Sequence, residues 1–204
     1  MDFLVFSAGG RVSHQLCEAV RSDGHSVTVC VPPRARAPPE VSVVEGDLTD
    51  TDTVAAAIAD RDVVCSTLGM ASDTAGTRLT DGLKRIVSTM ENTGVDRFVS
   101  VAAAGILQAT PTRLRLDTVE FPQELEAIAS AHKAVYDRLR RSTLDWTMVC
   151  PPQMSEGVPT NHYRTTVDYL PDGGQSISTG DVAAFVYQVA VHGHHIGERV
   201  GISY

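Results

Sequence analysis

The sequence lacks the features that mark several large classes of protein. Its 204 residues include only 4 cysteines, and none is spaced as a CxxC pair or near a histidine at zinc-ligand spacing. No run of about 18 apolar residues is present, so no segment is predicted to span a membrane. The N-terminus, MDFLVFSAGG, has no basic region of the kind that begins a signal peptide. Basic residues are few, and a net charge of −8 argues against a nucleic-acid-binding surface.

These absences leave one soluble globular domain in a reducing compartment, which we expect to be the cytoplasm. Hydrophobic residues make up 43% and charged residues 21%, which are ordinary values for a folded domain. Each cysteine lies in an apolar stretch, so we interpret all four as buried reduced thiols, with a catalytic or redox thiol at Cys150 as the alternative. No metal site is predicted, because the histidines within 192–195 are interpreted as a polar turn.

Short apolar stretches alternate with segments of helical periodicity along the whole chain. Phe3–Phe6 is an apolar run, a small-residue turn follows, and helical spacing then leads to a second run at 27–31. This pattern is a βαβ unit. Further strands are predicted at 41–44, 62–67, 97–103, 145–150 and 198–203, and helices at 51–59, 76–93, 123–142 and 180–192. The fold class is therefore α/β, a Rossmann-type doubly wound parallel sheet in three layers, as a single domain over 1–204.

Ligands of such sheets bind at the carboxyl ends of the strands, so the turn after the first strand is informative. It reads Ser7-Ala8-Gly9-Gly10-Arg11-Val12-Ser13. The two glycines and the helix starting near Arg11 offer bare backbone and a helix N-terminus to a pyrophosphate. In a three-glycine spacing, however, only Gly10 is glycine, because serine stands at 7 and 13. We predict a dinucleotide-binding turn, with a tight turn that binds no ligand as the alternative.

The end of the second strand indicates which dinucleotide is preferred. An acid there would bind the ribose hydroxyl of NAD, whereas arginine accommodates the extra phosphate of NADP. The strand is followed by Arg34 and Arg36, and no acid appears before Glu40. NADP (NADPH) is therefore preferred over NAD, and solvated surface charges are the alternative interpretation of the two arginines.

Six short motifs follow one another over nearly the full length of the chain. They are FSAGGRVS at 6–13, VVEGDL at 43–48, VVCSTLG at 63–69, GVDRFV at 94–99, LDWTMVCPPQ at 144–153 and ISTGDVA at 177–183. In this order and spacing the chain resembles the atypical short-chain dehydrogenase/reductase family, in its group of NADPH-dependent biliverdin-IXβ and flavin reductases.

With the turn and the two arginines, the resemblance implies a set of cofactor-binding positions. They are Ala8, Gly9, Gly10, Arg11, Val12, Arg34, Arg36, Asp47, Leu48, Thr67, Leu68, Gly69, Ala102, Pro151 and Gln153. The cofactor fold takes up nearly all of the 204 residues and leaves only small segments at about 104–125 and 153–178 to cover an acceptor, so we expect the acceptor pocket to be a shallow, open cleft. That pocket would contain Ala103, Gly105, Ile106, Gln153 and Met154.

The chain departs from the family at its reactive positions. The family's serine or threonine after the fifth strand is replaced by Ala102 and Ala103, its histidine after Pro-Pro by Gln153, and no Tyr-x-x-x-Lys pair is present. No catalytic residue is therefore identified. Gln153 is a candidate amide donor, and His132 is a candidate on a helix face that we otherwise expect to be solvated.

These observations predict an NADP-dependent reductase that transfers hydride to a planar conjugated acceptor of the flavin (FMN or FAD), biliverdin or quinone type. We expect a monomer or weak homodimer with no nucleic-acid or membrane partner. Two alternatives stay open, a dinucleotide-binding or sensor protein without turnover and a repurposed non-redox enzyme of the same fold.

Overall fold

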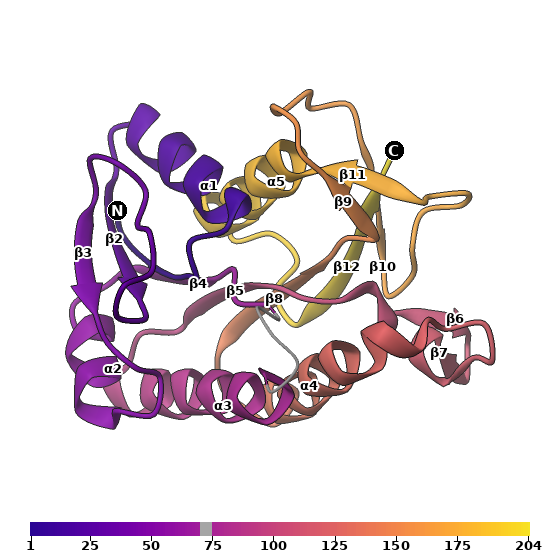
Figure 1. The fold of residues 1–204 in the computed structure, drawn as a ribbon, viewed down its shortest axis with the longest axis horizontal. Helices are drawn as coiled ribbons and strands as arrows, with labels where there is room; N and C mark the ends of the chain where they lie inside the picture. The colour runs from indigo at the N-terminus through magenta and orange to yellow at the C-terminus, as the bar shows by residue number, and fades with distance from the viewer. Residues whose placement is uncertain (70–74) are drawn as a thin grey trace.

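An eight-stranded sheet runs through the computed structural model, which describes residues 1–69 and 75–204 (Figure 1). The strand order is β10-β12-β8-β5-β4-β1-β2-β3, so the chain reverses its direction of travel across the sheet at β1. That reversal defines a doubly wound sheet. The sheet strands are β1 (Asp2–Phe6), β2 (Ser26–Val31), β3 (Ser42–Glu45), β4 (Val63–Ser66), β5 (Arg97–Val101), β8 (Asp145–Cys150), β10 (Arg164–Val167) and β12 (Glu198–Ser203). All pairings in this sheet are parallel except that of β10 with β12, at one edge.

Helices cover both faces of the sheet (Figure 1). One face carries α1 (Arg11–Ser22) and α5 (Thr179–His192), and the other carries α2 (Thr51–Ile58), α3 (Ala75–Thr93) and α4 (Gln123–Leu139). The first strand shows why its sequence is apolar throughout: Leu4 and Phe6 enter the core under α2, α3 and α4, whereas Phe3 and Val5 enter the core under α1 and α5. A strand buried on both faces has no solvated side, so its apolar residues do not alternate with polar ones. The α/β fold predicted from the sequence is confirmed.

Short elements follow the carboxyl ends of β5 and β8 and lie beyond that edge of the sheet. After β5 come η1 (Ala104–Ile106), the hairpin of β6 (Gln108–Thr110) and β7 (Arg113–Leu114), and η2 (Arg115–Asp117). After β8, strand β9 (Gln153–Ser155) pairs in parallel with β11 (Ser176–Ser178). These elements lie within the two segments that the sequence predicted to cover the substrate site.

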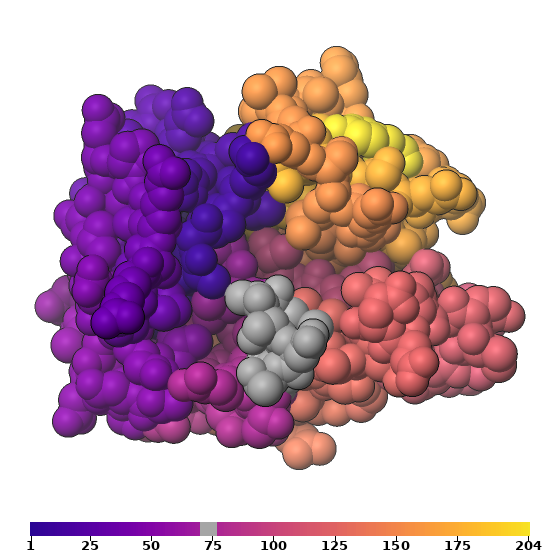
Figure 2. Space-filling model, viewed as in Figure 1, coloured from indigo at the N-terminus to yellow at the C-terminus, as the bar shows by residue number. Residues whose placement is uncertain are grey.

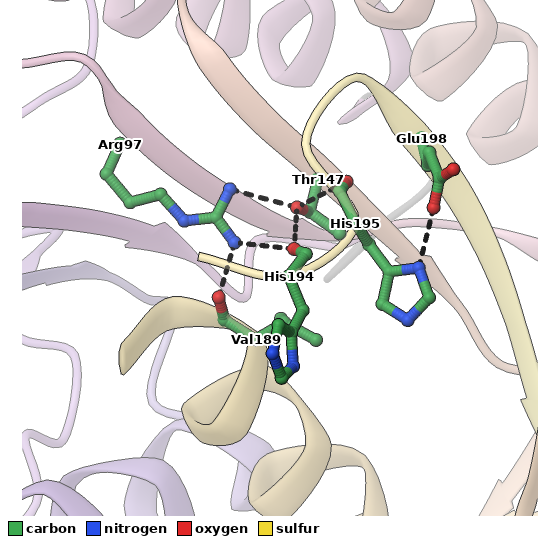
Figure 3. Close-up of polar contacts among 6 residues, drawn as sticks. All are labelled: Arg97, Thr147, Val189, His194, His195 and Glu198. Atoms are coloured by element: carbon green, nitrogen blue, oxygen red, sulfur yellow. Dashed lines mark hydrogen bonds and ion pairs between the residues drawn. The ribbon is translucent and has the colours of Figure 1, made fainter. Parts of the chain in front are cut away.

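The last helix is held at both ends by polar contacts. At its start, the Ser178 hydroxyl accepts the Asp181 amide, and the Asp181 carboxylate accepts the Thr160 amide at 2.7 Å. At its end, the Arg97 guanidinium donates to the Val189 carbonyl at 2.6 Å (Figure 3). The helix ends at Gly193, whose φ of 63° suits a glycine C-cap. No helix in the described part of the chain is long and apolar enough to cross a membrane.

The histidines that follow α5 belong to this end of the molecule, away from the carboxyl ends of the strands. The His194 carbonyl accepts from Arg97, and the His195 carbonyl accepts from the Thr147 hydroxyl (Figure 3). The His195 imidazole contacts the Glu198 carboxylate at 2.6 Å. Over residues 1–69 and 75–204, no three His, Cys, Asp or Glu side chains are grouped so that they could hold a metal ion.

Candidate functional site: a cavity at the carboxyl ends of the strands

The two serines in the turn after β1 hydrogen-bond to each other. The Ser7 hydroxyl donates to the Ser13 hydroxyl at 2.7 Å and accepts the Gly9 amide at 2.9 Å. The Ser13 hydroxyl in turn donates to the Gly10 carbonyl at 2.7 Å, and both serines are fully buried. Ser7 and Ser13, which stand where two glycines were expected, therefore stabilise the turn by hydrogen bonds on its buried side.

The glycines of the same turn keep its outer side bare. Gly9 has a φ of +87°, and a Cβ there would lie 2.7 Å from the Arg36 carbonyl oxygen. Gly10 is the N-cap of α1, has no side-chain cap, and a Cβ on it would meet nothing within 4 Å. The first amides of a helix have no intrahelical partner, so an uncapped, open start suits an anionic ligand. The turn therefore fits a dinucleotide pyrophosphate.

The loop after β2 rests on this turn, because the Arg36 carbonyl contacts Gly9. Arg34 and Arg36 are both exposed on this loop. Arg11, at the start of α1, forms an ion pair with Glu156, which follows β9. Both of these side chains are 64% exposed, so the ion pair is weak and easily exchanged.

Asp47 and Leu48, two of the predicted cofactor-binding residues, lie just after the carboxyl end of β3. Hydrogen bonds from Thr49 hold the pKa of the Asp47 carboxyl below its usual range, so it is ionised at neutral pH, and Arg78 lies 3.5 Å from it. Leu48 packs against Gly82 of α3, where a Cβ would lie 2.8 Å from the leucine side chain. Leu48 thus joins the loop to the core beside it.

A cavity of about 1020 Å³ opens at the carboxyl ends of the strands. Figure 2 shows this face hollowed between the segments that follow β5 and those that follow β8. Both segments that the sequence predicted to cover the site, at about 104–125 and 153–178, contribute residues to the walls of this cavity. The cavity contains many of the predicted site residues, namely Val12, Thr67, Leu68, Gly69, Ala102, Ala103, Gly105, Pro151, Gln153 and Met154.

The remaining predicted residues lie outside the cavity wall. Those of the phosphate turn and its surroundings are Ala8, Gly9, Gly10, Arg11, Arg34, Arg36, Asp47 and Leu48. The prediction that Ile106 lines the acceptor pocket is wrong, because this residue is 0% exposed and belongs to the hydrophobic core. The η1 turn directs it away from the cavity and places Gly105 at the wall instead.

His132, a candidate site residue in the sequence, lines the cavity, and the alternative expectation of a solvated helix face is wrong. Its side chain is 2% exposed and contributes to the cavity wall, because α4 packs against η1 and buries this side of the helix. The His132 Nδ1 accepts the Ala103 amide at 3.1 Å. Burial lowers its pKa from 6.5 to about 4, although the nearby Leu68 carbonyl partly opposes the shift. The imidazole is therefore neutral at pH 7 and carries its proton on Nε2, which is buried.

The cysteines are buried and unpaired, as the sequence predicted. Burial raises the pKa of Cys17 and Cys65 to about 12 and that of Cys30 to about 11. It raises the pKa of Cys150 further still. A thiol must ionise to act as a nucleophile, so none of the four is suited to catalysis.

Sequence reasoning missed a buried arginine that supports the cavity wall. Arg199 is 4% exposed, its Nε donates to Asp168 at 2.9 Å, and its Nη1 donates to the Ile106 carbonyl. Its guanidinium also lies over the Tyr136 ring at 4.2 Å. Through its hydrogen bond to the Ile106 carbonyl, Arg199 holds η1 in place on the side away from the cavity. Its partners lie 31 and 93 residues away along the chain, so no local pattern marks it.

A doubly wound sheet, an uncapped helix start after β1 and a cavity at the switch point together define a dinucleotide-binding Rossmann domain. The sequence matches the profile of one such family over residues 7–192. The chain belongs to that family, the NAD(P)H-binding family.

Solved structures agree with this assignment. A candidate exported protein of Burkholderia pseudomallei is 29% identical with a TM-score of 0.89, and the match covers 100% of both chains. A candidate NADH-flavin reductase of Streptococcus pneumoniae is 26% identical with a TM-score of 0.87, covering 100% of this chain and 99% of that one. A candidate epimerase of Bacteroides thetaiotaomicron is 26% identical with a TM-score of 0.86, covering 100% and 96%. The fold is thus of the NAD(P)H-binding oxidoreductase type, and the candidate activities named for two of these proteins, flavin reductase and epimerase, differ.

Proposed function

We propose that the protein is an NADPH-dependent reductase that transfers hydride to a planar conjugated organic acceptor. The observation that carries the proposal is the cavity, which runs from Val12 beside the phosphate turn to Phe121 and Met154 at its outer walls. One space therefore adjoins both the site that fits a dinucleotide and a largely apolar region large enough for an aromatic ring.

The residues have separate parts in holding the two reactants. The start of α1 would hold the pyrophosphate, Thr67–Gly69 would lie along the adjoining ribose, and Ala102 and Pro151 would flank the nicotinamide. A bound NADPH supplies the hydride. The small side chains of Ala102–Ala104 leave room for an acceptor ring to lie close to the reacting carbon, where distance and orientation govern the rate.

The described wall offers no buried acid. His132 is neutral, and the carboxylates among the lining residues, Glu120 and Glu124, are exposed at the outer end. A conjugated acceptor that has gained a hydride can take its proton from solvent, so this chemistry needs no protein acid. The candidate flavin reductase of S. pneumoniae, at 26% identity, supports the same class of acceptor.

The test is NADPH oxidation followed at 340 nm with a panel of FMN, riboflavin and quinones. We expect acceptor-dependent oxidation above the background without protein. Tight NADPH binding in calorimetry without oxidation by any acceptor would contradict the reductase and favour a binding or sensor protein, which the lack of a hydroxyl at Ala102 and Ala103 would then explain.

The preference for NADPH is tested at the loop that rests on the turn. Replacing Arg34 and Arg36 by alanine removes two guanidinium groups suited to the extra phosphate, so kcat/KM for NADPH should fall about tenfold or more while that for NADH changes little. Arg141→Ala, on an exposed arginine at the far end of α4, is the matched control. Equal losses with the two cofactors would contradict the assignment.

A further inference from the structure

The outer end of the cavity carries little positive charge. Among the described lining residues, the charged side chains are Arg115, Glu120 and Glu124. All three are exposed, and none forms an ion pair or a side-chain hydrogen bond within residues 1–69 and 75–204. This end of the cavity therefore has a net charge of −1.

The dinucleotide end has the opposite character. It presents the uncapped start of α1 and the guanidinium groups of Arg11, Arg34 and Arg36. In a protein with a net charge of −8, these local groups are what attract an anion, and they lie at one end of the site only.

Beside these carboxylates, much of the cavity wall is apolar. Phe121, Leu125 and Ile128 line one side, and Pro152 and Met154 line the other. A phosphate or carboxylate entering this region loses water, and the one cation among the described lining residues, Arg115, is outnumbered by the carboxylates of Glu120 and Glu124, so its entry is costly. An uncharged ring meets no such penalty and gains from contact with the apolar walls.

We infer that the acceptor is an uncharged planar ring, of the quinone or unphosphorylated flavin type, and that Glu120 and Glu124 disfavour acceptors with anionic tails. This rests on the proposed function, since it concerns the acceptor end of that same site. The inference limits the planar acceptors of the proposed function to those without a negative charge.

Riboflavin and FMN test the inference, because they share one ring system and differ by a phosphate. With NADPH at low salt, kcat/KM for riboflavin should exceed that for FMN by about threefold to tenfold, and salt at about 0.5 M should narrow the gap. The double variant Glu120→Gln/Glu124→Gln should also narrow it, mainly by improving FMN. Glu126→Gln is the matched control, because Glu126 is an exposed carboxylate of the same helix turn that does not line the cavity.

Binding measurements separate this inference from the proposed function. The affinities of riboflavin and FMN, from quenching of flavin fluorescence, give the charge preference without turnover, and anthraquinone against its 2-sulfonate gives a second matched pair. FMN equal to riboflavin, a gap that survives the double variant, or no binding of either uncharged ring would overturn the inference. Absence of NADPH oxidation with every acceptor would instead overturn the reductase, whatever the affinity ratio.

Discussion

At the scale of single residues, the turn after β1 shows how a dinucleotide motif tolerates substitution. Ser7 and Ser13 are accepted because their hydroxyls bond to each other and to the turn backbone, inside the protein. Gly9 is different, since its φ of +87° and its contact with the Arg36 carbonyl leave no room for a side chain. What the turn requires is bare backbone on the ligand side and a small bonded group on the buried side.

Gly9→Ala should therefore weaken NADPH binding more than tenfold, because the new methyl group displaces the Arg36 loop from the turn. Gly24→Ala is the control: its φ of +77° imposes a similar backbone strain, but nothing lies within 4 Å of the new Cβ. Both variants should lose about 1–2 kcal/mol in urea unfolding. Unchanged NADPH affinity in fluorescence titrations of Gly9→Ala would show that the contact with Arg36 is unimportant.

His132 predicts a specific pH dependence of stability. Its pKa is lowered by burial to about 4, so the unfolded chain takes up a proton below pH 6.5 that the folded chain resists. The free energy of unfolding should therefore be unaffected by this group above pH 7 and fall by up to about 3 kcal/mol as the pH drops from 6.5 to 4.

His132→Asn should remove that contribution while offering an oxygen to the Ala103 amide, and urea unfolding at pH 7, 6 and 5 measures it. His132→Leu should lose stability at pH 7 as well, since the buried Ala103 amide then has no partner. His162→Asn, on an exposed histidine, should keep the wild-type slope. An unchanged slope in His132→Asn would count against a buried neutral imidazole.

At the scale of elements, α5 depends on one arginine from the sheet. Arg97 donates to the Val189 carbonyl at 2.6 Å, to the Thr147 hydroxyl and to the His194 carbonyl (Figure 3). It also donates to the Asp145 carbonyl at 2.8 Å. It joins β5, β8 and the end of α5 through a single planar group. Lysine has no comparable fork of donors.

Arg97→Met should lower the free energy of unfolding by about 2–4 kcal/mol, because it leaves several partly buried acceptors without a donor. Arg97→Lys should recover only part of the loss. Chemical denaturation gives the values, with Arg141→Met as an exposed control. A loss below about 0.5 kcal/mol would show that water replaces the guanidinium.

At the scale of the whole molecule, the cavity depends on segments that are distant in sequence. Its walls come from the start of α1, from the residues at and after the ends of β4, β5 and β8, from α4, and from residues 174 and 175. A ligand that contacts all of them binds the folded state alone. At a hundred times its Kd, NADPH should therefore stabilise the protein by about 2.7 kcal/mol and raise the Tm by about 5–10 °C. No thermal shift with either NADPH or NADH would favour the non-redox alternative.

Local patterns were sufficient to predict the order of the elements and several of the residues that line the cavity. The apolar run at Phe3–Phe6, the small turn and the helical spacing after it are features of neighbouring residues, and each maps onto an observed element. Residues directly after a strand, such as Thr67–Gly69 and Ala102, were predictable because parallel strands all end at one edge. The pocket position of Ile106 and the solvated helix face of His132 were mispredicted, because the direction of these side chains depends on how η1 and α4 pack.

The sequence by itself determined a doubly wound α/β domain, buried thiols, and a bare turn followed by a helix start, since these depend on composition and short-range periodicity. Only the tertiary structure decided the size of the cavity, the neutral state of His132 and the contacts by which Arg199 holds η1 in place. These properties arise from contacts across tens of residues, where burial changes the pKa of a side chain and removes its competition with water. A short pattern of residues does not contain that information.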